Sequence, residues 1–336
     1  MSVDRRPGDH RDPVAASATP LPVERRPEPG PIAILPEPGP RFVAAVQAGG
    51  GTVGELSDAT RGIIWLDSSS SAPLERALRE HPGIGWVQLP WAGVDAFADV
   101  LARHADHAFP LWTSAKGAYS EPVAEHALTL ALACLRGLPE KARSTSWAPR
   151  PTGLSLFGRR VLIVGAGGIA AEMIRLLEPF HTVITVVRRR PAPMPGVART
   201  VTTDRLLEVL PEADLVILAA AATSETKNLI GAAELAAMRE DAVLVNIARG
   251  TLVDSSALAD ALTAGHLTGA GLDVTAPEPL PDGHPLWTAP RCVITSHSAD
   301  TPEMIAPLLA ERVRLNVEAL LGDGAFVGVV DPALGY

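Results

Sequence analysis

Short apolar runs alternate with stretches of helical spacing along most of the chain. From Pro31 onward, β-branched and aliphatic runs are bounded by turn residues, and the segments between them follow the helical period. Strands that alternate with helices through short connections pack as parallel sheets covered by helices. The pattern therefore predicts an α/β fold with parallel sheets. The predicted strands lie within residues 32–36, 62–67, 83–95, 159–165, 182–188, 213–221, 242–248, 270–274 and 292–298.

Start and stop signals mark several of the helices. A long helix is predicted within residues 120–142, with Ser120 as its N-cap, and Gly137 is predicted to end it. Asp254 is predicted to cap the helix that follows it. In the last helix, Pro307 is predicted to kink or delay the first turn. The other predicted helices are residues 40–50, 231–238, 255–265 and 302–322.

The first 31 residues lack this alternation. They are dense in Pro, Arg, Asp and Glu and nearly free of large apolar side chains. Such a segment buries too little surface to offset the entropy lost on ordering. We therefore expect residues 1–31 to form a disordered tail.

Composition narrows the class of protein. The 336 residues carry a formal net charge of −9, which disfavours a general binder of nucleic acid or of membrane surfaces. No apolar run reaches the roughly 18 residues of a membrane span, and no secretory signal is evident. Cys134 and Cys292 lie in apolar contexts without the spacing of a metal site. These features favour a cytoplasmic protein with reduced thiols, no metal, and no nucleic-acid or membrane partner.

A glycine pattern after the strand RVLIV indicates a dinucleotide site. Gly165 and Gly167 precede Ala170 in the spacing Gly-x-Gly-x-x-Ala, and a helix begins around Gly168 and Ile169. The first glycine permits a tight turn, the second lets the backbone approach a pyrophosphate, and the helix N-terminus holds the phosphates. The alternative is a glycine turn that serves packing alone.

Three charged side chains follow other predicted strands. Arg249 stands just after VLVNIA, at the edge where ligands of open α/β sheets bind, and its planar fork suits a carboxylate or a carbonyl oxygen. Glu278 and His297 follow the next two strands. A carboxylate beside a histidine orients the ring and stabilises its charged form, which is a general acid/base arrangement. Each residue alone also fits a bland role: a surface arginine, a solvated acid, a structural histidine.

Together, these motifs resemble one family, the D-isomer-specific 2-hydroxyacid dehydrogenases. The resemblance rests on VGAGGIA, NIARGTLVD, GLDVTAPEPLPDGHPLW and ITSHSAD, supported by WVQLPWAGVD and AYSEPVAEHALTLAL, and covers roughly Ile32 to Gly328. It implies two Rossmann-like or flavodoxin-like lobes. Residues 32–122 and 299–336 would form the substrate-binding lobe, and residues 123–298 the NAD(P)-binding domain.

The resemblance also implies roles. Arg249 would bind the carboxylate and keto oxygen of a 2-oxoacid, His297 would donate the proton during hydride transfer, and Glu278 would hold His297. The loop Ala92, Gly93 and Val94 would offer backbone N–H groups to the carboxylate. Asp273 would contact the nicotinamide carboxamide, and Ala248 would border the cofactor. The segment around Trp147 would join a homodimer interface.

Some positions depart from the family pattern. Ser296 replaces the usual proline before the catalytic histidine, and Asp300 replaces a usual glycine after it. Ala221 and Ala222 replace a usual Pro-Leu pair. These changes alter loop rigidity but leave the three catalytic side chains in place.

The run Arg188, Arg189 and Arg190 bears on the cofactor. Arg188 lies 18 residues after Ala170 (188 − 170), where an acid that binds the ribose is expected about 20 residues along. An arginine there binds a 2′-phosphate by charge-assisted hydrogen bonds, which an acid would repel. The run therefore predicts that Arg188 and Arg189 confer a preference for NADP, the alternative being a solvated loop with NAD as cofactor.

The sequence thus favours an NADPH-dependent 2-oxoacid reductase of the glyoxylate/hydroxypyruvate type. The alternative is a dinucleotide-sensing, corepressor-like interaction protein with little turnover, against which the intact catalytic set argues. An oxidase of formate or a similar one-carbon acid has no support in the motifs. Trp65, Trp91 and Trp112 lie near predicted strand ends and either line a substrate pocket or pack in the core.

Overall fold

The computed structural model describes residues 18–67, 70–147 and 150–334, and these fall into two compact units. Unit 1 combines Met1–Ser120 with Thr301–Tyr336, and unit 2 is Glu121–Asp300. From the sequence we placed the breaks after residues 122 and 298. The part of the expected tail that spans residues 1–17 lies outside the described residues.

Unit 1 is built on a four-stranded parallel sheet with the order β1-β2-β3-β4. Alternate strand residues point to opposite faces. Ile63 and Val87 enter one buried cluster, whereas Ile64 and Trp86 enter the other. The strands are β1 (Ile32–Leu35), β2 (Gly62–Trp65), β3 (Trp86–Gln88) and β4 (Leu111–Thr113).

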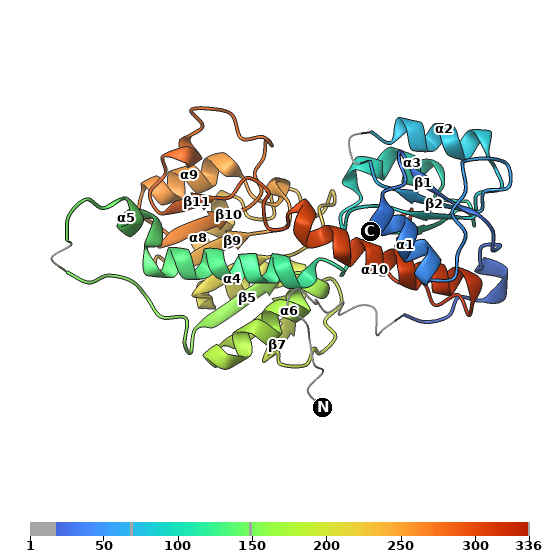
Figure 1. Cartoon of the computed structure of the whole chain (residues 1–336). Helices are drawn as coiled ribbons and strands as arrows, with labels where there is room; N and C mark the ends of the chain where they lie inside the picture. The colour runs from blue at the N-terminus through green and yellow to red at the C-terminus, as the bar shows by residue number, and fades with distance from the viewer. Residues whose placement is uncertain (1–17, 68–69, 148–149, 335–336) are drawn as a thin grey trace. The chain divides into compact units, whose positions relative to one another are not determined.

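The helices of unit 1 include one from the far end of the chain. Helix α10 (Pro302–Leu321) packs along α1 (Pro40–Ala48), and a Cβ at Gly49 would lie 2.7 Å from the carbonyl oxygen of Arg314. Figure 1 shows the two helices side by side. α10 starts at Pro302, capped by Thr301, and is continuous through Pro307, so the predicted delay of its first turn is wrong. The other helices are α2 (Ala72–Glu80) and α3 (Ala98–Arg103).

Part of the expected tail is ordered. Residues Val23–Arg25 form a 3-10 turn, the amide of Leu21 donates to Gly324 O at 3.1 Å, and Arg26 Nε donates to Leu21 O at 2.8 Å. Leu21 packs against a buried cluster of unit 1. Residues 18–31 thus differ from the disorder that we expected, because their few apolar side chains find partners on unit 1 that composition alone does not reveal.

Unit 2 is built on a seven-stranded parallel sheet with the order β11-β10-β9-β8-β5-β6-β7. The chain adds strands to one side of β5 and then returns to add β8 on the other side. The adjacent carboxyl ends of β5 and β8 therefore form a topological switch point, where open α/β sheets bind ligands. The strands are β5 (Arg160–Val164), β6 (Val183–Val187), β7 (Arg199–Val201), β8 (Leu215–Leu218), β9 (Val243–Asn246), β10 (Gly269–Leu272) and β11 (Cys292–Ile294).

The predicted end of the long helix at Gly137 is confirmed, and the residues just beyond it form a separate short helix. Gly137 adopts a left-handed backbone, φ 58°, and separates α4 (Ser120–Arg136) from α5 (Leu138–Arg143). The expected N-cap at Ser120 is wrong, because α4 already includes Ser120, whose buried hydroxyl has no hydrogen-bond partner among the described residues. The cap at Asp254 is confirmed: its carboxylate accepts from the amides of Ser256 and Ala257, both at 3.0 Å. The other helices of unit 2 are α6 (Gly168–Leu177), α7 (Leu206–Val209), α8 (Ala232–Ala237) and α9 (Ser255–Thr263).

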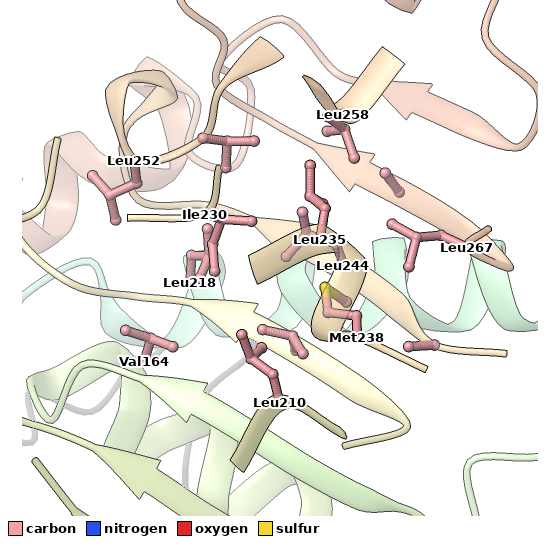
Figure 2. Packing of buried hydrophobic residues seen from close by; sticks show 14 of the residues in the cluster. Val164, Leu210, Leu218, Ile230, Leu235, Met238, Leu244, Leu252, Leu258 and Leu267 are labelled. Carbon is pink, nitrogen blue, oxygen red and sulfur yellow. The ribbon is translucent and has the colours of Figure 1, made fainter. Parts of the chain in front are cut away.

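The core of unit 2 is aliphatic. Figure 2 shows Leu244 of β9 beside Leu235 and Met238 of the α8 segment, and Leu218 of the neighbouring strand β8 beside Ile230. In unit 1, Trp65 and Trp112 are buried in a core cluster, which favours packing over the pocket role for these two. No helix in the described part of the chain is long and apolar enough to cross a bilayer.

Candidate functional site

The glycine turn follows β5. Gly165 has φ +116°, and a Cβ there would lie 2.4 Å from the carbonyl oxygen of Ala219. Only glycine fits this conformation and this approach to the end of β8. A Cβ at Gly167, which directly precedes α6, would meet nothing within 4 Å. The turn is therefore packed on the sheet side and open on the side of the α6 N-terminus, while Ala170 is buried below it.

The three consecutive arginines begin where β6 ends. Val187 pairs with Val164, and its carbonyl oxygen accepts the amide of Gly165 at 2.8 Å, so Arg188 directly follows the strand beside the glycine turn. Arg188 is half-buried and donates from Nη1 to Ala192 O at 3.4 Å, while Arg189 and Arg190 are exposed. This end of β6 therefore carries three positive charges next to the turn.

Arg249 lies in the loop after β9. The buried Asn246 fixes this loop: its Oδ1 accepts the amide of Ala248 at 3.1 Å and its Nδ2 donates to Arg249 O at 2.9 Å. The next residue, Gly250, allows close packing, because a Cβ there would lie 1.8 Å from Thr275 O. The loop that holds Arg249 therefore packs tightly on the loop that leads to Glu278.

Glu278 and His297 form a direct pair. His297 Nδ1 lies 2.6 Å from Glu278 Oε1, and Glu278 Oε2 accepts the amide of Thr275 at 3.4 Å. Both side chains are exposed, at 47% and 41%. Because Nδ1 is engaged by the carboxylate, Nε2 remains for proton exchange with another molecule.

Asp273 lies behind this pair and is 1% exposed. Its carboxylate accepts from the hydroxyl of Thr295 at 2.6 Å and from the amides of Ser298 and Ala299 at 2.8 and 3.1 Å. Burial alone would raise the pKa of Asp273, but these bonds and His126 outweigh it and lower the pKa to about 2. Asp273 is thus an ionised acceptor that holds the turn carrying His297.

Asp300 adds another carboxyl to the group. Burial raises the pKa of Asp300, while the positive charges of His297 and Arg249 oppose the rise and the charge of Asp273 adds to it. The charged side chains of this group follow three neighbouring strands of the sheet of unit 2. Arg249 follows β9, Glu278 follows β10, and both His297 and Asp300 follow β11.

In unit 1, the loop after β3 has open backbone donors. Ala92 is exposed, Gly93 is half-buried and Val94 is buried at the start of a short 3-10 turn. Within the described chain, no hydrogen bond is found from the backbone N–H of Ala92 or Gly93. Trp91 lies beside Tyr119, with ring centroids 6.4 Å apart, and remains half-buried.

Among residues 18–67, 70–147 and 150–334, no group of three His, Cys, Asp or Glu side chains is placed so that it could hold a metal ion. Cys134 and Cys292 are free thiols, and burial raises the pKa of each to about 12. A thiol that stays protonated is a poor nucleophile and a poor ligand.

Comparison with known protein families identifies the domain that contains this sheet. Residues 128–299 match the NAD binding domain of the D-isomer specific 2-hydroxyacid dehydrogenases. The chain belongs to this family.

Relatives of the dehydrogenase family extend the likeness beyond that domain. A protein of Corynebacterium melassecola is 36% identical over 299 residues, which are 87% of this chain and 95% of that protein. A glyoxylate reductase/hydroxypyruvate reductase of Mus musculus is 33% identical over 54% of this chain and 58% of the mouse protein. A D-isomer specific 2-hydroxyacid dehydrogenase from Xanthobacter autotrophicus Py2, crystallised with NADPH and MES, has a TM-score of 0.76 at 25% identity, covering 92% of this chain and 100% of that one.

The glycine turn of this dehydrogenase fits a nicotinamide dinucleotide. Gly167 leaves the surface above the α6 N-terminus clear, and that terminus directs backbone N–H groups towards an anion. Gly168 and Ile169, the first residues of α6, are half-buried there.

Two polar residues of the dehydrogenase site were not predicted. His126 on α4 and Thr295 after β11 both contact Asp273. His126 lies on a helix and not at the end of a strand, and Thr295 follows a strand but carries no charge, so neither stood out in the sequence. The available signal was the polar histidine within the apolar helix SEPVAEHALTLAL.

Proposed function

We propose that this protein reduces a small 2-oxoacid, of the glyoxylate or hydroxypyruvate type, to the D-2-hydroxyacid with NADPH. The observation that carries the proposal is the His297–Glu278 pair at 2.6 Å, on the same sheet edge as Arg249. A carboxylate-backed imidazole and a guanidinium are what reduction of a keto acid needs: a proton donor and a binding group for two oxygens.

In this proposal, Arg249 holds the carboxylate and the keto oxygen of the substrate by its planar fork. The negative charge that develops on the keto oxygen during reduction is stabilised by the same guanidinium. His297, charged and oriented by Glu278, donates its Nε2 proton to that oxygen. The dinucleotide, when bound at the glycine turn, supplies the hydride. We assign the loop Ala92, Gly93 and Val94 of unit 1 to the substrate carboxylate.

We propose NADPH rather than NADH because of the charge at the end of β6. Arg188, half-buried beside the glycine turn, stands where an acid would favour NADH, and Arg189 follows it. The Xanthobacter dehydrogenase with this fold was crystallised with NADPH, which supports the assignment. Ala248, buried at the loop after β9, is assigned to the border of the cofactor site.

We further propose a homodimer. Three large apolar side chains between α4 and β5 are exposed in the described chain: Leu138, Trp147 and Phe157, with Trp147 at 96%. Large apolar side chains that stay exposed in this way are more typical of protein–protein interfaces than of surfaces that face solvent.

The activity is tested with a panel of 2-oxoacids, each assayed with NADPH and with NADH. We expect turnover of at least one small 2-oxoacid, and we expect Arg249→Ala to lower its kcat/KM by about 100-fold or more, because both orientation and charge stabilisation are lost. An arginine variant within threefold of the parent would remove Arg249 from the mechanism. Dinucleotide binding without turnover of any 2-oxoacid would favour the sensing, corepressor-like function instead.

A further inference from the structure

The turn that carries His297 has an unusual backbone. Ser296 and His297 have φ angles of 51° and 54°, two consecutive non-glycine residues in the left-handed region. Such a conformation persists only where the surroundings hold it. Here Asp273 holds it from three points: its carbonyl oxygen accepts the amide of His297 at 2.6 Å, and its carboxylate accepts the next two amides.

Asp273 is itself contacted by a second histidine. His126 Nε2 lies 2.9 Å from Thr295 Oγ1 and 3.4 Å from Asp273 Oδ1, although 169 residues separate His126 from Thr295. Thr295 gives its only proton to Asp273 at 2.6 Å. Its hydroxyl oxygen, and the ionised carboxylate, can then only accept. The proton between them and His126 therefore resides on His126 Nε2.

The packing of α4 on β10 explains this position. His126, Leu130 and Cys134 are spaced by four residues and share one face of α4. Gly269 and Gly271 share one face of β10, and side chains at these positions would meet Cys134 and Leu130, respectively. The two glycines let the helix approach the strand closely. The next residue on this face of α4 is His126, four residues before Leu130, and the next on this face of β10 is Asp273, two residues after Gly271. These two side chains are in contact, as the spacing requires.

We propose that His126 is a positioning residue for the reductase activity, on which this inference rests: it holds Thr295 and Asp273 in the arrangement that fixes the catalytic turn. Without this donor, Thr295 and the Asp273 carboxylate lose one of the contacts that fix their orientation. The turn then relaxes towards ordinary backbone angles, and the ring of His297 moves away from Glu278. Binding of the substrate by Arg249 and of the pyrophosphate at the glycine turn does not pass through this contact.

The proposal is tested with His126→Ala, His126→Gln and His126→Asn. The Gln amide nitrogen reaches about as far as Nε2 of histidine, whereas the Asn amide is shorter. We expect the Ala and Asn variants to lose about 10- to 100-fold in kcat, because the proton donor is misplaced. KM and the dissociation constant of NADPH should stay within about threefold, and Gln should restore most of kcat. Thr129→Ala, an exposed position on the same helix, is the control and should match the parent.

A double-mutant cycle shows whether the effect passes through His297. In the background His297→Gln, loss of His126 should cost little further kcat, because the group that it positions is gone. An equal loss in both backgrounds, or no restoration by Gln, would overturn the proposal.

Hydrogen exchange of the segment 292–300 gives a readout that needs no substrate. The amides of His297, Ser298 and Ala299 donate to Asp273, so His126→Ala should speed their exchange at least 10-fold, and His126→Gln should restore it. Unchanged exchange would overturn the positioning role. If the parent reduces no 2-oxoacid, the proposed function fails, but the exchange experiment still decides on His126.

Discussion

At the scale of single residues, the His297–Glu278 contact gives a prediction on proton donation. Glu278→Gln replaces the carboxylate that orients the ring of His297 by a neutral amide, so kcat should fall about 10- to 100-fold while KM changes little. The measurement is kcat and KM of the parent and the variant at fixed pH and ionic strength. An unchanged kcat would exclude Glu278 from proton donation.

Asp273 gives a prediction about acid stability. Its pKa is lowered from 3.8 to about 2 in the folded protein, so the unfolded chain binds protons more readily. The resulting stabilisation, about 2 kcal/mol by linkage, is present above about pH 4 and is lost as pH falls towards 2. The free energy of unfolding of unit 2 should therefore differ between the parent and Asp273→Asn by about 2 kcal/mol more at pH 6 than at pH 2.

Urea unfolding across this pH range measures that difference. If the difference in the free energy of unfolding between parent and variant stays constant from pH 6 to pH 2, Asp273 contributes no charge-dependent stability.

At the scale of elements, the turn between β5 and α6 makes different demands of its two glycines. Gly165→Ala should destabilise unit 2, because φ +116° is strained for alanine and its Cβ would overlap Ala219 O. The strain alone costs about 1–3 kcal/mol. Gly167→Ala should leave the free energy of unfolding within about 0.5 kcal/mol of the parent, because its Cβ enters open space. It should nevertheless weaken dinucleotide binding, since the backbone can no longer approach the pyrophosphate.

Thermal unfolding and cofactor titration of the two variants separate these effects. Tight dinucleotide binding by Gly167→Ala would show that the phosphates lie elsewhere.

The end of β6 gives the prediction on cofactor choice. A hydrogen bond between charged groups contributes about 1.5–3 kcal/mol, part of which salt screens at this half-buried site. Arg188→Asp should therefore lower kcat/KM with NADPH by roughly 10- to 100-fold. The kcat/KM of the same variant with NADH should rise, because the new carboxylate accepts hydrogen bonds from the ribose hydroxyls. Arg190→Ala, at the exposed third arginine, is the matched control.

A parent that prefers NADH, or an NADPH/NADH ratio unmoved by Arg188→Asp, would mean that the arginines only face solvent.

The elements also show what the sequence could predict. Long apolar runs such as those of β5 and β9 were predicted, because their pattern is local. Strands β4 and β7 have three residues each and were not assigned. The strand-end positions of Arg249, Glu278 and His297 follow from the same local pattern. The contact of His126 with Thr295 does not, because it depends on how α4 crosses β10.

At the scale of the whole molecule, the exposed indole of Trp147 gives a prediction on assembly. If Trp147 is covered by a second copy, Trp147→Ser should raise the dimer dissociation constant by at least about 10-fold, since an indole buried at an interface often contributes 2 kcal/mol or more. Analytical ultracentrifugation over a concentration series measures this. Val23→Ser, another exposed apolar site, is the control and should not change the mass. A parent that sediments as a monomer at all concentrations would contradict the dimer.

The composition of unit 1 from both ends of the chain sets an order of events during synthesis. Unit 2 is complete as soon as Asp300 has left the ribosome, whereas unit 1 still lacks α10. Until α10 emerges, Gln88 and Ser114 lack the bonds that Asn316 and Arg312 provide, and the apolar face of α1 is bare. The α1 side of the nascent unit 1 therefore exposes apolar surface throughout translation of unit 2, and surface of this kind makes an incomplete domain prone to aggregation.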